Sequence, residues 1–279
     1  MKKSWLNGKR IILTGASSGI GKALCVSLVQ KHGCKVTGVA RNEARCKELK
    51  TLLGENFTYE LFDVADETAW QNFAIRLKKS DTMPDVLINN AGMLPPFCRF
   101  EKTNAEFFDR AINTNFYAAV YACRALLPLL KRSPSPAIIN VSSSAALCAL
   151  PGITAYAASK AAVKSFTESL ASEYKKKNLY VGLVLPGFAM TDIFREQKSA
   201  KNAADAARTK KAIAAVAMPC EKMAKKIERA IVKRKRRKIF GADAKGMNLL
   251  YKLFPSHAAD ICGNILKLCS LTLFESVFE

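Results

Sequence analysis

Short apolar runs alternate along the chain with longer segments whose apolar residues recur every three or four positions. The short runs predict strands at residues 10–14, 36–40, 85–89, 137–142, 180–185 and 237–241, and a further strand that ends at 61–63. The longer segments predict helices at 19–32 and 42–53, and a capping box of Thr103 and Glu106 predicts a long helix towards residue 131. Continuously apolar strands separated by helices are typical of a parallel sheet covered on both faces.

This order of elements predicts one α/β domain over residues 1–245, a doubly wound parallel sheet of about seven strands with helices on both faces. Residues 187–218 begin with bulky apolar side chains and lack a clear element, which predicts a lid that closes over a substrate. Residues 246–279 form an amphipathic C-terminal extension, whose last apolar segment, 261–274, is interrupted by Lys267. That segment is too short and too polar to span a bilayer.

A glycine-rich turn follows the first predicted strand. Gly15, Gly19 and Gly21 lie between that strand and the next helix, inside a βαβ unit. Such a turn lets backbone N–H groups and the positive end of a helix approach a pyrophosphate, so it predicts a dinucleotide site. A tight turn that binds nothing is the alternative.

The end of the second predicted strand bears on which dinucleotide binds. An NAD site generally has an acidic side chain there, whereas this chain has Arg41 and Asn42 and no carboxylate. Arg41 can form charge-assisted hydrogen bonds to a 2′-phosphate, so we predict NADP(H) in preference to NAD(H). The alternative is a solvated arginine at the start of a helix.

Four motifs occur in one order along the chain: TGASSGIG at 14–21, NNAG at 89–92, YAASK at 156–160 and PGFAMT at 186–191. In these motifs the chain resembles the classical short-chain dehydrogenase/reductase family over roughly residues 5–245. The resemblance implies a Rossmann-type fold, one active site per subunit, and homodimers or homotetramers. The cofactor residues that it implies, to be added to Arg41 and Asn42, are Gly15, Ser17, Ser18, Gly19, Ile20, Gly21, Asp63, Val64, Asn89, Ala91, Gly92, Tyr156, Lys160, Pro186, Gly187 and Thr191.

The reacting centre is predicted from spacing. Tyr156 and Lys160 are four residues apart on one helix face, and Ser143 follows the fifth strand, where open α/β sheets bind ligands. A lysine ammonium at about 4 Å, in an effective dielectric of about 20, contributes on the order of 4 kcal/mol. That energy would lower a phenol pKa from about 10 to near neutral, where general acid catalysis is most efficient. Ser142 and Ser144 stay open as alternatives to Ser143.

These residues predict an NADPH-dependent oxidoreductase in which Tyr156 is the general acid/base and Ser143 holds the carbonyl oxygen. The resemblance adds Asn115, implied to steady the long helix and a water that leads to Lys160. Apolar residues at 93–97, 147–153 and after Pro186 predict a bulky apolar ketone or secondary alcohol of steroid, bile-acid or long-chain type. Two alternatives are an acyl-carrier-linked 3-ketoacyl reductase and a non-catalytic NADP-binding or basic membrane-surface protein. The complete Ser–Tyr–Lys set disfavours the second.

Charge and cysteine content bear on partners and compartment. The 279 residues carry 44 Lys and Arg against 23 Asp and Glu, a net charge of +21, of which +12 comes from residues 195–238 (16 basic against 4 acidic). Peripheral membrane contact through the basic C-terminal third is a possibility, whereas the absence of interleaved aromatic residues argues against nucleic acid. The nine scattered cysteines and the absence of an apolar leader predict a reducing, cytoplasmic compartment and no metal site.

Overall fold

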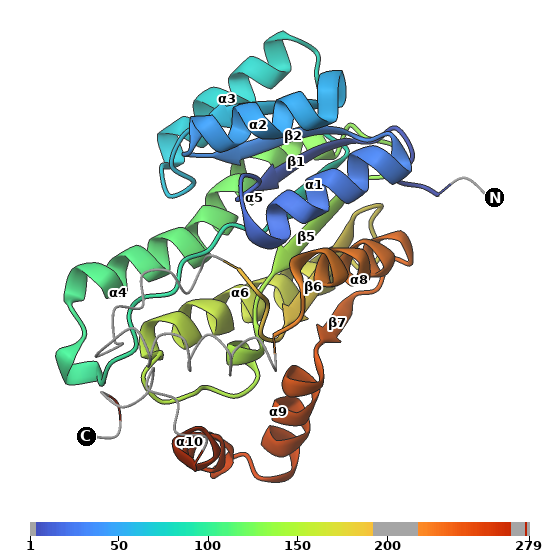
Figure 1. Ribbon diagram of the computed structural model, residues 1–279. Helices are drawn as coiled ribbons and strands as arrows, with labels where there is room; N and C mark the ends of the chain where they lie inside the picture. Colours follow the sequence, from blue (N-terminus) through green and yellow to red (C-terminus); the bar gives the residue numbers. More distant parts are fainter. Residues whose placement is uncertain (1–3, 192–216, 269–276, 278–279) are drawn as a thin grey trace.

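The computed structural model describes residues 4–191, 217–268 and 277 (Figure 1). One parallel sheet of seven strands has the order β3-β2-β1-β4-β5-β6-β7, which confirms the predicted fold class. The strands are β1 (Arg10–Thr14), β2 (Lys35–Ala40), β3 (Phe57–Leu61), β4 (Val86–Asn89), β5 (Ala137–Val141), β6 (Tyr180–Pro186) and β7 (Arg237–Phe240). The order reverses between β1 and β4, the switch point at which open α/β sheets bind ligands.

Helices cover both faces of the sheet. Side chains of α1 (Gly19–His32), α2 (Glu43–Leu53) and α8 (Cys220–Val232) share one buried cluster. Side chains of α3 (Glu67–Lys79), α5 (Ala118–Leu130) and α6 (Thr154–Glu173) share a second. Within β1, Ile11 and Leu13 belong to the first cluster and Ile12 to the second, and all three are buried. Because both faces of the strand are buried, its sequence is continuously apolar rather than alternating.

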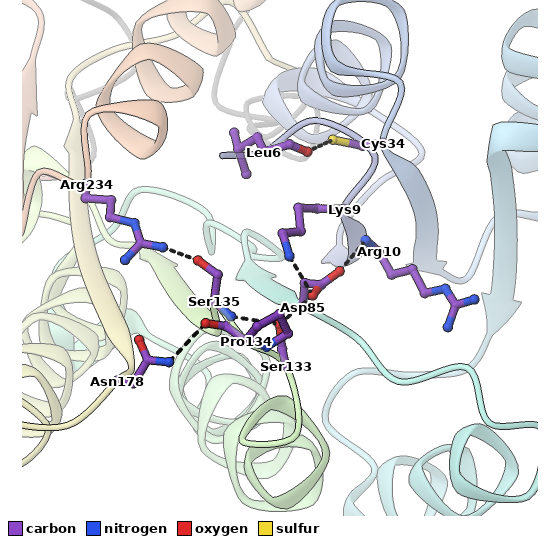
Figure 2. Close-up of polar contacts among 10 residues, drawn as sticks. All are labelled: Leu6, Lys9, Arg10, Cys34, Asp85, Ser133, Pro134, Ser135, Asn178 and Arg234. Carbon is purple, nitrogen blue, oxygen red and sulfur yellow. Dashed lines mark hydrogen bonds and ion pairs between the residues drawn. The ribbon is translucent and has the colours of Figure 1, made fainter. Parts of the chain in front are cut away.

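A polar clasp joins β1, β4 and the segment before β5 at the amino ends of these strands (Figure 2). Asp85 accepts hydrogen bonds from Lys9 Nζ at 3.0 Å, from the Arg10 backbone N–H at 3.0 Å and from the Ser133 hydroxyl. Burial by itself would raise the pKa of this carboxyl, but the hydrogen bonds and the Lys9 charge hold it below its ordinary value. The clasp lies at the amino ends of the strands, so the loops at their carboxyl ends take no part in it.

Three details of the predicted elements are wrong. The third strand ends at Leu61, so Asp63 lies in the turn that follows it. The predicted capping box is absent because the Asn104 side chain, and not that of Thr103, caps α4 (Ala105–Ile112), accepting from the Glu106 backbone N–H at 2.8 Å. The long helix is also divided, since a π-helical turn at Asn113–Tyr117 separates α4 from α5.

The C-terminal part continues from β7 into α9 (Ala242–Leu253) and α10 (Ala258–Leu268), which extend beyond the sheet in Figure 1. No helix in the described part of the chain is long and apolar enough to cross a membrane. Within the same ranges there is no disulfide and no group of three or more His, Cys, Asp or Glu that could hold a metal. Most of the predicted lid, residues 192–216, and residues 269–274 of the last apolar segment lie outside the described residues.

Candidate active site

A cavity of about 460 Å³ opens at the carboxyl ends of β1, β4, β5 and β6. The glycine turn after β1 forms one wall, and α6 contributes Tyr156 and Lys160. Segments that are far apart in sequence therefore meet at the switch point of the sheet, where the topology predicts a ligand.

The glycine turn has the geometry that a phosphate cradle needs. Gly15 and Gly19 have φ of +68° and +52°, in the left-handed region that favours glycine. A Cβ at Gly15 would lie 2.9 Å from Ala91 Cα, and one at Gly21 would lie 2.0 Å from the Gly15 carbonyl oxygen, so neither position accepts a side chain. The N-terminus of α1, a helix of 14 residues, points its unpaired N–H groups at the same turn. These residues fit a dinucleotide pyrophosphate.

Six predicted cofactor residues, Asn89 and five others, lie outside this cavity lining. Asn42 caps α2, its Oδ1 accepting from the Arg45 backbone N–H at 3.0 Å. Val64 packs in the core, and its carbonyl accepts from the Trp70 indole at 2.9 Å. Asp63 pairs with Arg41, Ser17 lines an adjacent hollow beside α1, and Gly21 contacts the turn from within α1.

Two arginines face the cavity near the end of β2. Arg41 lies in its lining and forms an exposed ion pair with Asp63, Nη1 to Oδ2, at 3.3 Å. Arg45, which the sequence analysis overlooked, lines the cavity from the first turn of α2. Its place in the first turn of the predicted helix, directly after the end of the second strand, was the available signal.

The NNAG segment at the end of β4 both joins neighbouring strands and lines the cavity. Asn89 belongs to the interior, where its Nδ2 donates to Asn140 Oδ1 at 2.8 Å and Asn140 donates to the Thr167 hydroxyl at 2.9 Å. Asn90, another residue missed from sequence, ties β4 to β1, donating from Nδ2 to the Thr14 carbonyl at 3.1 Å. Ala91 and Gly92 line the cavity, as predicted.

The three serines after β5 are distinguished by their partners. The Ser142 hydroxyl donates to the Lys160 carbonyl at 2.7 Å and is buried. Ser143 is hydrogen-bonded to the side chain of Tyr156 and accepts from the Ala145 backbone N–H at 3.2 Å. Ser144 lines the cavity and begins a short 3₁₀ turn. Of the three hydroxyls, that of Ser143 is the one in contact with the Tyr156 side chain.

Lys160 lies beside the tyrosine ring, with Nζ 5.9 Å from the ring centroid, and donates to the Val141 carbonyl at 3.3 Å. Burial lowers the pKa of the lysine to about 8. Burial also raises the pKa of Tyr156, and the Ser143 hydrogen bond only partly opposes that rise. This direction is opposite to the predicted lowering, because desolvation of the phenol outweighs the Ser143 hydrogen bond.

Asn115 lies in the π-helical turn, and both the oxygen and the nitrogen of its side-chain amide form hydrogen bonds. Its Oδ1 accepts from the Met93 backbone N–H at 2.7 Å, and its Nδ2 donates to the Met93 carbonyl at 3.0 Å and to the Ser159 hydroxyl at 2.8 Å. The side chain therefore joins the loop after β4 to α6 beside Lys160. A π-helical turn is a common feature of functional sites, and here it directs this amide inwards.

The remaining lining comes from the segment after β6. Pro186, Gly187 and Thr191 line the cavity, and Thr191 approaches the glycine turn so closely that a Cβ on Gly19 would lie 3.0 Å from its methyl group. Asp243, at the start of α9, accepts from the Phe188 backbone N–H at 2.7 Å. This contact, which sequence analysis missed, fixes the segment that leads into the predicted lid.

The site combines a serine hydroxyl hydrogen-bonded to a phenol, a neighbouring lysine and a glycine-rich turn that fits a pyrophosphate. Together these features define an oxidoreductase site on a dinucleotide-binding α/β fold. The model of the short chain dehydrogenase family matches residues 9–202. The chain therefore belongs to the short-chain dehydrogenase/reductase family, whose members bind a nicotinamide cofactor.

Three known proteins illustrate this relationship. Benzil reductase ((S)-benzoin forming) of Saccharomyces cerevisiae is 33% identical over 68% of this chain and 74% of its own. The 3-oxoacyl-[acyl-carrier-protein] reductase of Haemophilus influenzae is 30% identical over 67% of this chain and 77% of its own. The structure of a short-chain dehydrogenase from Shigella flexneri, complexed with NADP, has a TM-score of 0.66 at 27% identity, over 72% of this chain and 86% of its own.

Proposed function

We propose that this protein is an NADPH-dependent reductase of bulky apolar ketones, acting in reverse on the corresponding secondary alcohols. The observation that carries the proposal is the hydrogen bond between Ser143 and Tyr156 beside Lys160, inside a cavity that is polar at the glycine turn and apolar at its far end. A protein that only binds a dinucleotide has no need of a phenol held in this way.

Each residue of the site would take a separate part in carbonyl reduction. Bound NADPH supplies a hydride for the carbonyl carbon. Tyr156 donates its hydroxyl proton to the carbonyl oxygen, and its raised pKa keeps that proton in place at neutral pH. Ser143 donates a hydrogen bond to the same oxygen and stabilises its developing negative charge. Lys160, when protonated, stabilises the phenolate that remains on Tyr156.

The apolar end of the cavity supports the substrate class. Leu94, Phe97, Leu150, Ile153 and Phe188 line it, and among the described lining residues the only charged ones are Lys160 and the two arginines near the glycine turn. A large apolar group would gain about 25 cal/mol for each Å² of surface removed from water. Steroid, bile-acid and long-chain ketones are therefore the substrates to test first.

The preference for NADPH is supported by Arg41 and Arg45, which line the cavity on the side of the glycine turn. Arg41 shares its guanidinium with Asp63, and its exposed side chain keeps further N–H donors for a 2′-phosphate. Replacing Arg41 with Ala should raise the KM for NADPH about tenfold and leave the KM for NADH nearly unchanged. Equal changes for the two cofactors would contradict this assignment.

The deciding experiment follows NADPH absorbance against a panel of steroid, bile-acid, long-chain and simple aromatic ketones. Tyr156→Phe should abolish turnover, and Ser143→Ala should lower kcat on the order of 100-fold. Tyr180→Phe is the matched control, because the Tyr180 hydroxyl donates to the Lys235 carbonyl at 2.9 Å, away from the cavity. Undiminished turnover by the Tyr156 variant would overturn the mechanism.

An acyl-carrier-linked 3-ketoacyl reductase is the second candidate, supported by the Haemophilus influenzae relative and by the net charge of +21. A carrier-dependent enzyme would reduce a 3-ketoacyl group on an acidic carrier protein far faster than on a small thiol. Comparable rates on both would favour the apolar-ketone proposal. We also propose a homodimer or homotetramer in the cytoplasm, and sedimentation velocity would measure the assembly.

A further inference from the structure

The end of α9 exposes large apolar side chains close together. Leu249, Tyr251, Leu253 and Phe254 are 57%, 49%, 62% and 51% exposed. Single exposed apolar residues are ordinary on a protein surface, but four within six residues at one helix end are a concentration typical of an interaction site. We call these four residues the α9 tip.

The two sides of α9 differ in what they contact. Ala244 and Met247 are buried on the inner side, and Met247 packs in one cluster with the cavity-lining Leu94 and Leu150. Leu249 and Leu253, four residues apart, share the outer side. An amphipathic helix of a compact domain buries its one apolar face, whereas α9 has a second apolar side, at Leu249 and Leu253, that is exposed.

The charge beside the tip has one sign. Lys245 and Lys252 precede and follow Leu249 by four and three residues and are both exposed. The single acidic residue of α9, Asp243, is engaged with the Phe188 N–H, and residues 244–259 contain no Asp or Glu. The outer side of α9 is thus apolar and positive.

The basic run at residues 233–238, within the basic C-terminal third, is partly used by the protein itself. The Arg234 guanidinium lies 4.4 Å from the Trp5 ring centroid and donates to the Ser135 hydroxyl, as Figure 2 shows for the serine contact. Arg236 donates to the Ala171 carbonyl at 2.9 Å. At least two of the six basic residues of this run are therefore engaged within the protein.

We propose that the α9 tip docks the protein on a bilayer surface that contains anionic lipid. Leucine and phenylalanine would enter the boundary between headgroups and acyl chains, tyrosine would lie at the headgroup level, and the two lysines would contact lipid phosphates. In a symmetric dimer through this face the same patch of each copy would meet the other, and the lysines would find on α9 only Asp243, which already accepts from the Phe188 N–H. This inference goes beyond the proposed function and does not depend on it.

Sedimentation of the full chain with vesicles tests the proposal. We expect binding to vesicles of 70% phosphatidylcholine and 30% phosphatidylglycerol, and weaker binding to pure phosphatidylcholine. Leu249→Glu combined with Leu253→Glu should lower binding to the anionic vesicles at least about tenfold. Lys252→Ala should lower it about fivefold, the contribution of one basic residue near an anionic surface.

The control carries the same charge change at equally exposed positions. Leu52 on α2 and Ile75 on α3 are 58% and 51% exposed, at the opposite end of the molecule from α9 in Figure 1. Leu52→Glu combined with Ile75→Glu should leave vesicle binding unchanged. Turnover of a water-soluble ketone reports on the proposed function separately and should be the same in both double variants.

Several results would overturn the proposal. These are no binding of the wild type to anionic vesicles, equal losses in the two double variants, or binding that survives the changes at Leu249 and Leu253. A shift of the α9 variant to a smaller species in sedimentation velocity, without any vesicle binding by the wild type, would assign this face to a second copy of the chain instead.

Discussion

Gly92 offers a sharp test of the catalytic geometry. A Cβ at this position would lie 3.1 Å from Asn115 Oδ1 and 3.1 Å from Lys160 Nζ, closer than the roughly 3.4 Å at which ordinary Cβ contacts begin. Gly92→Ala therefore forces one of these two groups to move by a few tenths of an ångström. No unusual backbone angle is involved, so the effect is one of space alone.

The two neighbours of Gly92 are held unequally. The Asn115 amide makes three hydrogen bonds of 2.7 to 3.0 Å, whereas Lys160 Nζ makes one of 3.3 Å to the Val141 carbonyl. The ammonium should consequently be the group that moves. Overpacking a buried site costs about 1–3 kcal/mol, and if about 1.4 kcal/mol of that is lost from the transition state, kcat falls about tenfold.

Steady-state kinetics and urea unfolding of the same samples measure the two consequences. We expect kcat to fall about tenfold while the free energy of unfolding falls by about 1 kcal/mol, the low end of the range for overpacking, because the lysine side chain can shift. Gly246→Ala is the control, because a Cβ there meets nothing within 4 Å, and replacing a helical glycine should stabilise the protein by about 0.5–1 kcal/mol. An unchanged kcat with a large loss of stability would show that the Asn115 loop yields instead, and the reasoning would be wrong.

Three further predictions concern stability. Glu228 accepts from Lys31 at 2.7 Å and from Ser27, and these hydrogen bonds hold its pKa below the ordinary value despite burial, so Glu228→Gln should cost about 2 kcal/mol at pH 7. That difference between the variant and the wild type in urea unfolding should shrink as the pH falls below the ordinary carboxyl pKa of about 4.3 and towards the lowered pKa of the folded protein. Asp243→Ala should cost about 1–3 kcal/mol by leaving the Phe188 N–H without its acceptor, and Asp243→Asn should restore part of it. Because burial lowers the pKa of Lys160 to about 8, unfolding binds a proton between pH 8 and 10.5, and the stability of the wild type relative to Lys160→Met should rise over that interval in urea titrations.

The fold could be predicted from the sequence because its signals are local. Continuously apolar strands such as Ile11–Leu13 report burial on both faces, and glycines at 15, 19 and 21 report the turn between β1 and α1. The start of α4 could not be predicted as well, because Thr103 and Asn104 are both good caps and the choice between them depends on the loop before the helix. The π-helical turn at Asn113–Tyr117 has no sequence pattern of its own.

The candidate site shows the same division between local and long-range information. Spacing was sufficient to associate Tyr156 with Lys160, since residues four apart share a helix face. It could not foresee that Asn89 turns into the core towards Asn140, or that Asp243 reaches back to Phe188 from 55 residues away. The direction of the Tyr156 pKa was also beyond the sequence, because it depends on how much water the folded chain excludes from the phenol.

The three adjacent serines show how one strand end serves both structure and chemistry. Successive side chains of an extended segment point to opposite sides, so Ser142 and Ser143 cannot share a task. Ser142 bonds the Lys160 carbonyl and fixes the helix that carries the acid, whereas Ser143 bonds the acid itself. A change at Ser142 should therefore act through the position of α6, altering stability and kcat together. A change at Ser143 removes a donor to the reacting oxygen and should lower kcat with little effect on unfolding, so the two substitutions separate positioning from transition-state stabilisation within one tripeptide.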